Sequence, residues 1–126
     1  MSDSPRSLPQ MSTDVDSALA LVCTVPAIGR NGRRTDVQAV LSLASSCRGV
    51  DDGVAITFPN TDDVLQSVVD LVAAERNCCA QFRYTIDFPP EHQPIELRVQ
   101  APAQLVQPLR DLYVGLAREA GIDAAP

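Results

Sequence analysis

The chain has 126 residues, which is enough for one domain with its own hydrophobic core and too few for two domains of ordinary size. Hydrophobic residues make up 45% of the sequence and charged residues 21%, values that exclude a fibrous or wholly disordered chain. The net charge of -6 argues against a nucleic-acid partner, and no apolar run reaches the roughly 18 to 20 residues of a membrane span. We therefore expect a soluble protein.

The first 16 residues are rich in Ser, Pro and Asp and predict a flexible leader. They lack the basic segment and the apolar stretch of a secretory signal, so we expect a cytoplasmic protein in a reducing compartment. A single domain is expected over residues 17–122, followed by a short tail at 123–126. The four cysteines are then candidates for metal binding, thiol chemistry or core packing rather than for disulfides.

The first half of the domain predicts a strand, a helix and a second strand. An apolar, β-branched run over residues 18–25 indicates a buried strand that carries Cys23 near its end. A helix is expected over residues 35–46, with Cys47 at its fraying end. After an Asp-Asp-Gly turn, residues 54–58 predict a short strand.

The second half predicts a long helix, a hairpin and a final helix. Apolar residues recur at helical spacing over residues 61–79, and Asp62 and Asp63 occupy the first turn, where the helix dipole favours anions. Residues 82–88 and 95–100 alternate between apolar and polar side chains and predict an antiparallel hairpin. The last segment, 101–121, shows helical spacing again, with Pro108 indicating a bend or a late start.

These elements follow the order βαβαββα. Both long helices need a sheet face to cover, so we expect an α+β fold, a two-layer sandwich with a four-stranded mixed sheet covered by helices.

Two adjacent cysteines, Cys78 and Cys79, end the long helix. Glu75 precedes them by three and four residues, so one carboxylate can serve both thiols. Consecutive residues are too close for a relaxed disulfide, and the C-terminal end of a helix disfavours a thiolate. A coordinated metal ion deprotonates a thiol outright, so the electrostatics favour a metal-linked role over a free nucleophile.

The same cysteines can also be read as core residues, because cysteine is among the most buried residue types. This reading is stronger for Cys47, which has no acid or base nearby, and intermediate for Cys23. The one histidine, His92, lies in a Pro-rich loop and is expected to be exposed. A zinc site of ordinary Cys and His spacing is therefore not expected.

Several short motifs together resemble a known group of proteins. They are Cys23-Thr24 before an Arg-bearing loop, Asp52-Gly53, Phe58-Pro59, the run from Leu71 to Glu75-Arg76-Asn77-Cys78-Cys79, and Phe82. In these motifs the chain resembles the small uncharacterised actinobacterial proteins with an ERxCCxF-type vicinal-cysteine signature, over about residues 18 to 116.

The resemblance implies a thiol or heavy-metal protein that is associated with mercury resistance and has no assigned reaction. Carried over position by position, it selects Cys23, Glu75, Arg76, Cys78 and Cys79, and it omits Cys47. The chain departs from that group after the cysteine pair, where Ala80 and Gln81 stand in place of Pro and an aromatic residue.

Our first hypothesis is a binder of a soft metal ion: Hg(II), As(III), Cu(I) or Zn(II). Cys78 and Cys79 would bind the ion with Cys23 as a third thiolate, since three sulfurs suit trigonal coordination. Glu75 would accept the released protons or act as a weak fourth ligand, and Arg76 would balance the negative charge.

Two alternatives remain open at this point. The same thiols with Glu75 as proton donor are the parts needed for protonolysis of a metal-carbon bond, as in organomercurial lyases. The chain could instead be a small interaction module with structural cysteines, in which an accessible sheet edge favours a homodimer.

Overall fold

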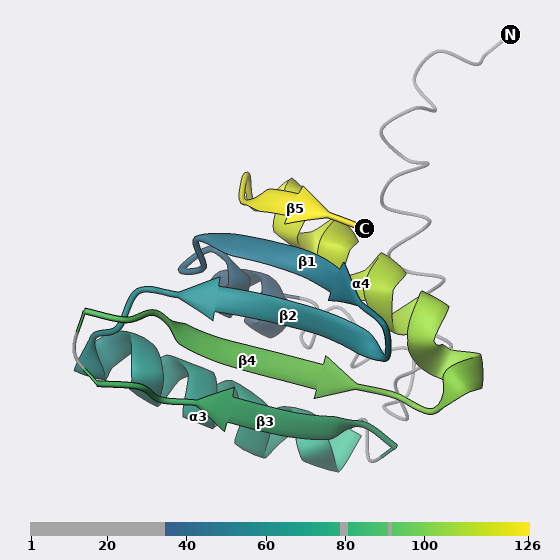
Figure 1. The fold of residues 1–126 in the computed structure, drawn as a ribbon, viewed down its shortest axis with the longest axis horizontal. Helices are drawn as coiled ribbons and strands as arrows, with labels where there is room; N and C mark the ends of the chain where they lie inside the picture. The colour runs from purple at the N-terminus through teal and green to yellow at the C-terminus, as the bar shows by residue number, and fades with distance from the viewer. Residues whose placement is uncertain (1–34, 79–80, 91) are drawn as a thin grey trace, which may run out of the picture.

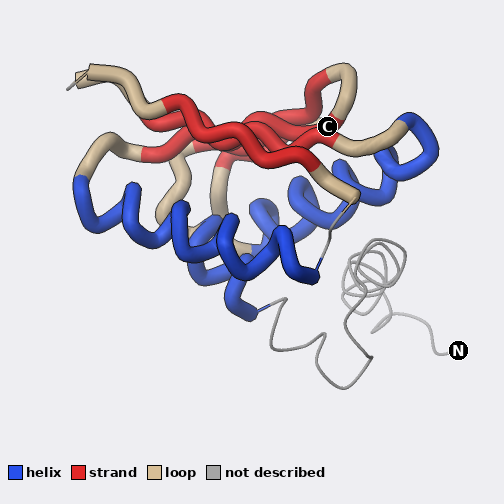
Figure 2. Tube along the Cα trace, turned by 90° about the horizontal axis from the view of Figure 1, so that it is seen from below, coloured by secondary structure: helices blue, strands red, loops and turns tan. Residues whose placement is uncertain are grey.

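The computed structural model describes residues 35–78, 81–90 and 92–126. In this part of the chain a mixed five-stranded sheet has the order β3-β4-β2-β1-β5, with helices packed on one of its faces (Figure 1 and Figure 2). The α+β class is therefore confirmed.

The strands pair antiparallel except at one edge, where β5 runs parallel to β1. The sheet consists of two antiparallel hairpins, β1 with β2 and β3 with β4, which are joined where β2 pairs with β4. The last strand, β5, lies beside β1. The strands are β1 (Ser46–Val50), β2 (Gly53–Phe58), β3 (Arg83–Asp87), β4 (Ile95–Gln100) and β5 (Asp123–Ala125).

The turn between β1 and β2 depends on Gly53. A Cβ atom at this position would lie 1.8 Å from the carbonyl oxygen of Val99, so only glycine lets the start of β2 approach β4 so closely. From helix α4 (Val106–Glu119), the guanidinium of Arg110 donates hydrogen bonds to the backbone oxygens of Val50 and Gly53. The turn is thus held by the sheet on one side and by a helix on the other.

In the described part of the chain, three α-helical segments cover the sheet on the same side (Figure 2). Residues 35–41 are helical, α3 spans Asp62–Cys78, and α4 spans Val106–Glu119 after the short 3-10 helix η2 (Ala103–Leu105). At the start of α3 the hydroxyl of Thr61 accepts a hydrogen bond from the backbone N–H of Val64, as in a helix cap.

The last helix starts late, and Pro108 lies in its first turn. Backbone N–H groups in the first turn have no partner within the helix, so the N–H that proline lacks costs little there.

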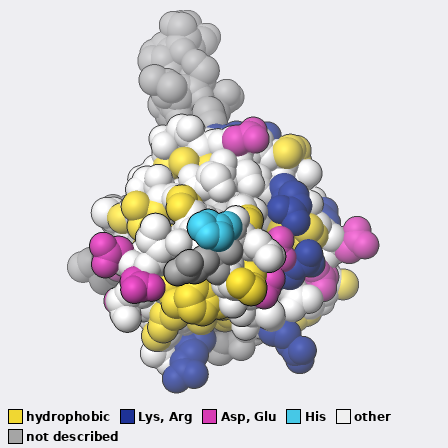
Figure 3. Space-filling model, turned by 60° about the vertical axis from the view of Figure 1, so that its left-hand side comes forward, with side chains coloured by type: hydrophobic (Ala, Val, Ile, Leu, Met, Phe, Trp, Pro, Cys, Tyr) yellow, Lys and Arg dark blue, Asp and Glu magenta, His cyan; other side chains and the backbone are white. Residues whose placement is uncertain are grey.

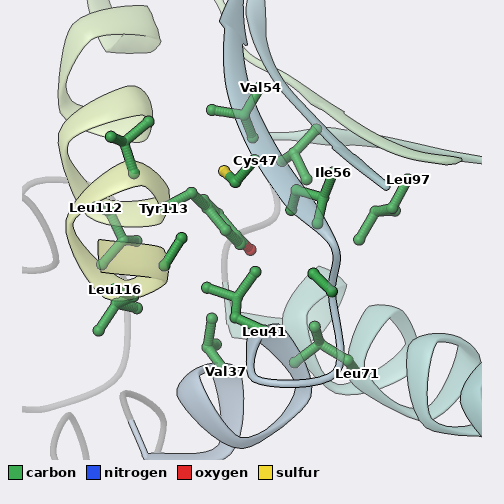
Figure 4. Close-up of a cluster of buried hydrophobic side chains, with 14 of the residues drawn as sticks. Val37, Leu41, Cys47, Val54, Ile56, Leu71, Leu97, Leu112, Tyr113 and Leu116 are labelled. Carbon is green, nitrogen blue, oxygen red and sulfur yellow. The ribbon is translucent and has the colours of Figure 1, made fainter. Parts of the chain in front are cut away.

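The core lies between the sheet and these helices and contains almost only apolar side chains. Burial alternates along β4, as expected for a strand with one covered face, whereas β2 is buried along almost its whole length and contributes Val54, Ile56 and Phe58 to the core. Figure 4 shows how side chains from α4, β1, β2 and residues 35–41 meet there. The largest fully buried residues are Tyr113, Phe58, Leu41, Ile56, Ile95, Leu97, Leu109, Leu112, Leu116, Val54 and Val68.

The expected four-stranded count and the order βαβαββα are wrong for the described part of the chain. The helix expected over residues 35–46 ends at 41, and β1 follows it as a strand that the sequence analysis did not identify. Residues 46–50 contain Gly and Arg and have weak strand propensity, so their pairing with β2 decides their structure.

Two further expectations concern the ends of the chain. Residues 123–125, expected in a short tail, form β5 beside β1. The leader over residues 1–16 and the strand over residues 18–25 lie outside the described residues.

Candidate functional site

Glu75 is the one charged side chain that is buried among the described residues, with 3% of its surface exposed. It lies in the last turns of α3, on the same helical stripe as Val68 and Leu71, which pack against the sheet. Three- and four-residue spacing brings these side chains to one face of the helix. A carboxylate thus occupies a position where this pattern otherwise supplies apolar residues.

Tyr113 of α4 approaches this carboxylate from the opposite side of the core. Its hydroxyl donates a long hydrogen bond of 3.5 Å to Oε1 of Glu75, while its ring is packed within the apolar cluster. Figure 4 shows the ring reaching from α4 across the cluster, with Cys47 beside it and the hydroxyl at the far end. Sequence analysis assigned Tyr113 to the core and did not identify this contact, because nothing in the spacing of α4 indicates where the hydroxyl ends.

Cys78 is the last residue of α3, three residues after Glu75, so its backbone lies within one helical turn of Glu75. Arg76, in the same turn, is exposed to solvent. Cys79, Cys23 and the side chain of Cys78 lie outside the described residues. The structure thus brings Glu75, Arg76 and position 78 together, and contact between Cys23 and the cysteine pair stays a prediction.

No three His, Cys, Asp or Glu side chains are grouped so that they could hold a metal ion within residues 35–78, 81–90 and 92–126. All three expected thiolate ligands fall outside what that search covers. The soft-ion site is therefore an inference from the sequence and from the surroundings of Glu75.

Cys47 has a different environment from the one expected. It lies on β1, not at a helix end, and its thiol is a free, buried group in the apolar core. Burial disfavours the thiolate and raises the pKa of Cys47 to about 12, although the charge of Arg48 acts in the opposite direction. This thiol is therefore unreactive at neutral pH and suited to packing.

His92 is exposed, as expected, and sits at the surface of the loop between β3 and β4 (Figure 3). Its backbone has a φ of 77°, a left-handed conformation that is uncommon for residues other than glycine. The amide of Asn60 donates hydrogen bonds to the carbonyl oxygens of Pro89, Pro90 and Gln93, so this loop is tied to the start of α3.

A groove of about 340 Å³ runs between residues 35–41 and α3. Its walls include Val40 and Leu71, and Ala74 lies at the end nearer to Cys78. Sequence analysis did not identify this groove, because its two walls come from separate helices whose distance is set by the packing of the core.

Comparisons with known proteins add no assignment. No protein-family model matches the chain, and neither the curated proteins nor the solved structures include one that is significantly similar to it. Within the described residues, no helix is long and apolar enough to cross a lipid bilayer. Function must therefore be argued from the site itself.

Proposed function

We propose that the protein binds a soft, thiophilic metal ion through Cys78 and Cys79, with Cys23 as a third thiolate. The observation that supports this proposal is the buried carboxylate of Glu75, one turn before Cys78 in α3. Removing a carboxyl group from water is costly unless it is paired or hydrogen-bonded. A buried acid that precedes two adjacent cysteines by three and four residues, in an otherwise apolar core, supports a functional role, because glutamate is rarely buried for packing alone.

Each neighbouring residue has a role in such a site. A thiol must lose its proton to bind a metal ion, and Glu75 accepts that proton or acts as a weak fourth ligand. The hydroxyl of Tyr113 orients the carboxylate from across the core. Arg76 is exposed in the same turn and balances part of the negative charge of the thiolates. Thiolate ligands select Hg(II), As(III), Cu(I) and Zn(II) over hard cations such as Mg(II).

The test is a titration of the anaerobically reduced protein with Hg(II), As(III), Cu(I) and Zn(II), followed by ultraviolet charge-transfer absorption and native mass. We expect one tight equivalent in the wild type that is lost in the Cys78→Ser/Cys79→Ser double variant. Cys47→Ser is the matched control, because it removes a buried thiol outside the site and should keep the equivalent. Equal titrations of the wild type and the double variant would refute the proposal.

The third thiolate has its own test. Cys23→Ser should weaken As(III) binding at least tenfold, since As(III) prefers three sulfur ligands, and should affect Hg(II) less, since two sulfurs suffice for it. Unchanged As(III) binding in Cys23→Ser would reduce the site to the cysteine pair.

A second candidate is an enzyme that cleaves a metal-carbon bond. It is favoured by the hydrogen bond from Tyr113 to Glu75, because an acid that delivers a proton to carbon needs a fixed orientation in a dry site. In that reaction Glu75 protonates the carbon, the metal-carbon bond breaks, and the metal stays on the thiolates. Glu75→Gln should then abolish release of the hydrocarbon and leave stoichiometric metal binding intact.

A further inference from the structure

The two edges of the sheet differ in length in the described part of the chain. At one edge β5 has only three residues, whereas β3 at the other edge has five, Arg83–Asp87. Alternate residues of an edge strand direct their backbone N–H and C=O groups away from the sheet, where a further strand can pair with them. No residue of β3 is buried, so this edge is accessible to such a strand.

The side chains of β3 make this edge complementary to a second copy of itself. Arg83, Thr85 and Asp87 are exposed on the face of the sheet opposite the helices, with the two charges at the two ends of the strand. In an antiparallel pair of β3 strands centred on Thr85, Arg83 lies directly opposite Asp87 of the partner subunit. The pair then contains two such contacts between opposite charges, and cross-strand pairs of this kind stabilise a sheet.

The same register also uses the whole of β3. Side chains alternate between the two faces, so two strands that keep their helices on one side can slide against each other only by two residues at a time. Such a slide shortens the overlap of the five-residue strands by two and leaves either Arg83 or Asp87 outside the pair. Full overlap and charge pairing therefore favour the same register.

The charge of Asp87 also favours a positive partner at this edge. Within one chain Asp87 lies directly opposite Glu96 of β4, and like charges at opposite positions are unfavourable. Glu96 is already paired with Arg48 and Arg98. Arg83 of the partner subunit would bring a positive charge to the other side of Asp87 and offset the repulsion.

The helix layer contributes apolar surface at this edge. The large apolar side chains that are exposed among the described residues are Leu43, Val69 and Phe88, and two of them lie here. Phe88 directly follows β3. Val69 lies on α3, which contacts β3 (Figure 1), on the flank opposite the residues Ser67 and Ala74 that line the groove toward residues 35–41. A second copy at this edge would remove Val69 and Phe88 from water, which is favourable.

We propose that two copies of this chain form a two-fold symmetric dimer by antiparallel pairing of their β3 strands around Thr85. The sheet then continues from one subunit into the other, and the Val69 flanks of the two α3 helices face each other on the helix side. Such an interface uses the same surface of both subunits. The inference is independent of the proposed function, because none of these residues belongs to the proposed metal site.

The test measures self-association of the full chain by analytical ultracentrifugation, with a reductant present so that no disulfide joins two copies. Arg83→Asp places carboxylates opposite each other at both ends of the strand pair, and Asp87→Arg places guanidinium groups there. Because the symmetry makes each change act twice, we expect each variant to raise the dissociation constant of the dimer at least about tenfold. The double variant Arg83→Asp/Asp87→Arg exchanges the charges and should restore wild-type association.

Mixing the two single variants gives a further check. Arg83→Asp and Asp87→Arg are complementary to each other, so the mixture should form a heterodimer although each variant alone associates weakly. Arg118→Asp is the matched control, because it makes the same change of charge at an exposed position of α4, away from β3 (Figure 1), and should leave association unchanged. Circular dichroism checks that every variant is folded.

A pair of apolar variants tests the helix layer. Val69→Ser should weaken association about threefold, because the dimer no longer covers this apolar side chain. Leu43→Ser removes a side chain of similar exposure that precedes β1, and β1 is separated from β3 by β2 and β4, so it should have no effect.

A wild type that stays monomeric at all concentrations would overturn the inference, whether another segment of this chain or another protein then covers the edge. A dimer that neither single charge variant weakens, or that the double variant does not restore, would lie at another surface and would also overturn it. Metal titration of the wild type is a separate measurement, so either result would leave the proposed function standing.

Discussion

A carboxylate on the covered side of the sheet and one on the uncovered side have opposite environments. On the inner face, covered by helices, Glu75 is enclosed with apolar side chains and contacts the hydroxyl of Tyr113. On the outer face, left uncovered by the helices in Figure 2, Glu96 accepts hydrogen bonds from Arg48 at 3.2 Å and Arg98 at 2.8 Å. The carboxylate of Glu96 forms ion pairs with these two arginines at the partly exposed surface of the sheet. The carboxylate of Glu75 is kept away from solvent, one helical turn before the end of α3, which makes it the candidate for chemistry.

Tyr113 connects the inner face to the candidate site, so it offers the sharpest test of this contrast. Tyr113→Ala should lower the free energy of unfolding by about 3 to 5 kcal/mol, because it removes a fully buried aromatic ring. Tyr113→Phe keeps the ring and removes the hydroxyl with its long hydrogen bond to Glu75, so its cost should be about 1 kcal/mol. Urea unfolding followed by circular dichroism measures both. Equal losses would mean that the hydroxyl, not the ring, carries the contribution of Tyr113.

On the outer face, a large effect of substitution is expected at Gly53. Gly53→Ala places a methyl group against the backbone of β4, which cannot move aside as a side chain could, and should cost up to about 3 kcal/mol. Gly121→Ala is a useful comparison, because its Cβ meets no atom within 4 Å and only its φ of 79° opposes the change. Thermal unfolding of the two variants would contradict this picture if Gly53→Ala were the milder one.

Cys47 makes the inner face sensitive to alkaline pH. The pKa of its thiol is about 12 in the folded protein and near 9 when the chain unfolds, so the folded state keeps the proton longer. The titration of Cys47 leaves stability unchanged well below pH 9 and lowers it as pH rises from 9 toward 12. The loss should reach about 2 kcal/mol at pH 10.5, from a slope of about 1.4 kcal/mol per pH unit.

The control for this pH effect is Cys47→Ala, which has no thiol to titrate. The urea midpoint should fall less between pH 8 and pH 10.5 in this variant than in the wild type. The difference between the two proteins removes the effects of all other titrating groups. An identical alkaline loss in both proteins would show that Cys47 does not cause it.

The smallest effect is expected on the outer face at Glu96. Hydrogen bonds from Arg98 and Arg48 lower the pKa of this carboxyl group, so its contribution is present above pH 4.5 and is lost as pH falls through the lowered value. Since the residue is half-exposed and screened by water, Glu96→Gln should cost at most about 1 kcal/mol at pH 7. A comparison of acid unfolding curves tests it, and a larger loss would mean that the outer pairing is as important as the inner core.

Elements with a clear period could be predicted from the sequence. The helix from Asp62 and the hairpin of β3 and β4 follow helical and alternating patterns, and the structure confirms them. By contrast, β1 and β5 could not be predicted, because Ser46–Val50 and Asp123–Ala125 have little strand propensity of their own. Their strand structure comes from pairing with distant partners, which a local pattern does not record.

One part of the candidate site could also be predicted from the sequence and another could not. Glu75 is a candidate site residue in the sequence because its spacing to Cys78 and Cys79 is local, and the structure adds that this carboxylate is buried. The contact with Tyr113 joins residues 38 positions apart and depends on how α3 and α4 pack on the sheet. Distances of that kind are set by the core as a whole and are not readable from either helix alone.

The pairing of β2 with β4 also has a consequence for folding kinetics. Each hairpin, β1 with β2 and β3 with β4, pairs neighbours in the chain, whereas β2 and β4 are separated in the chain by both α3 and β3. Closing that long loop costs chain entropy, so docking of the two hairpins is expected to be the slow step. Glu75 near the end of α3 meets Tyr113 of α4 only once the hairpins have docked, so the refolding chain would complete this contact last.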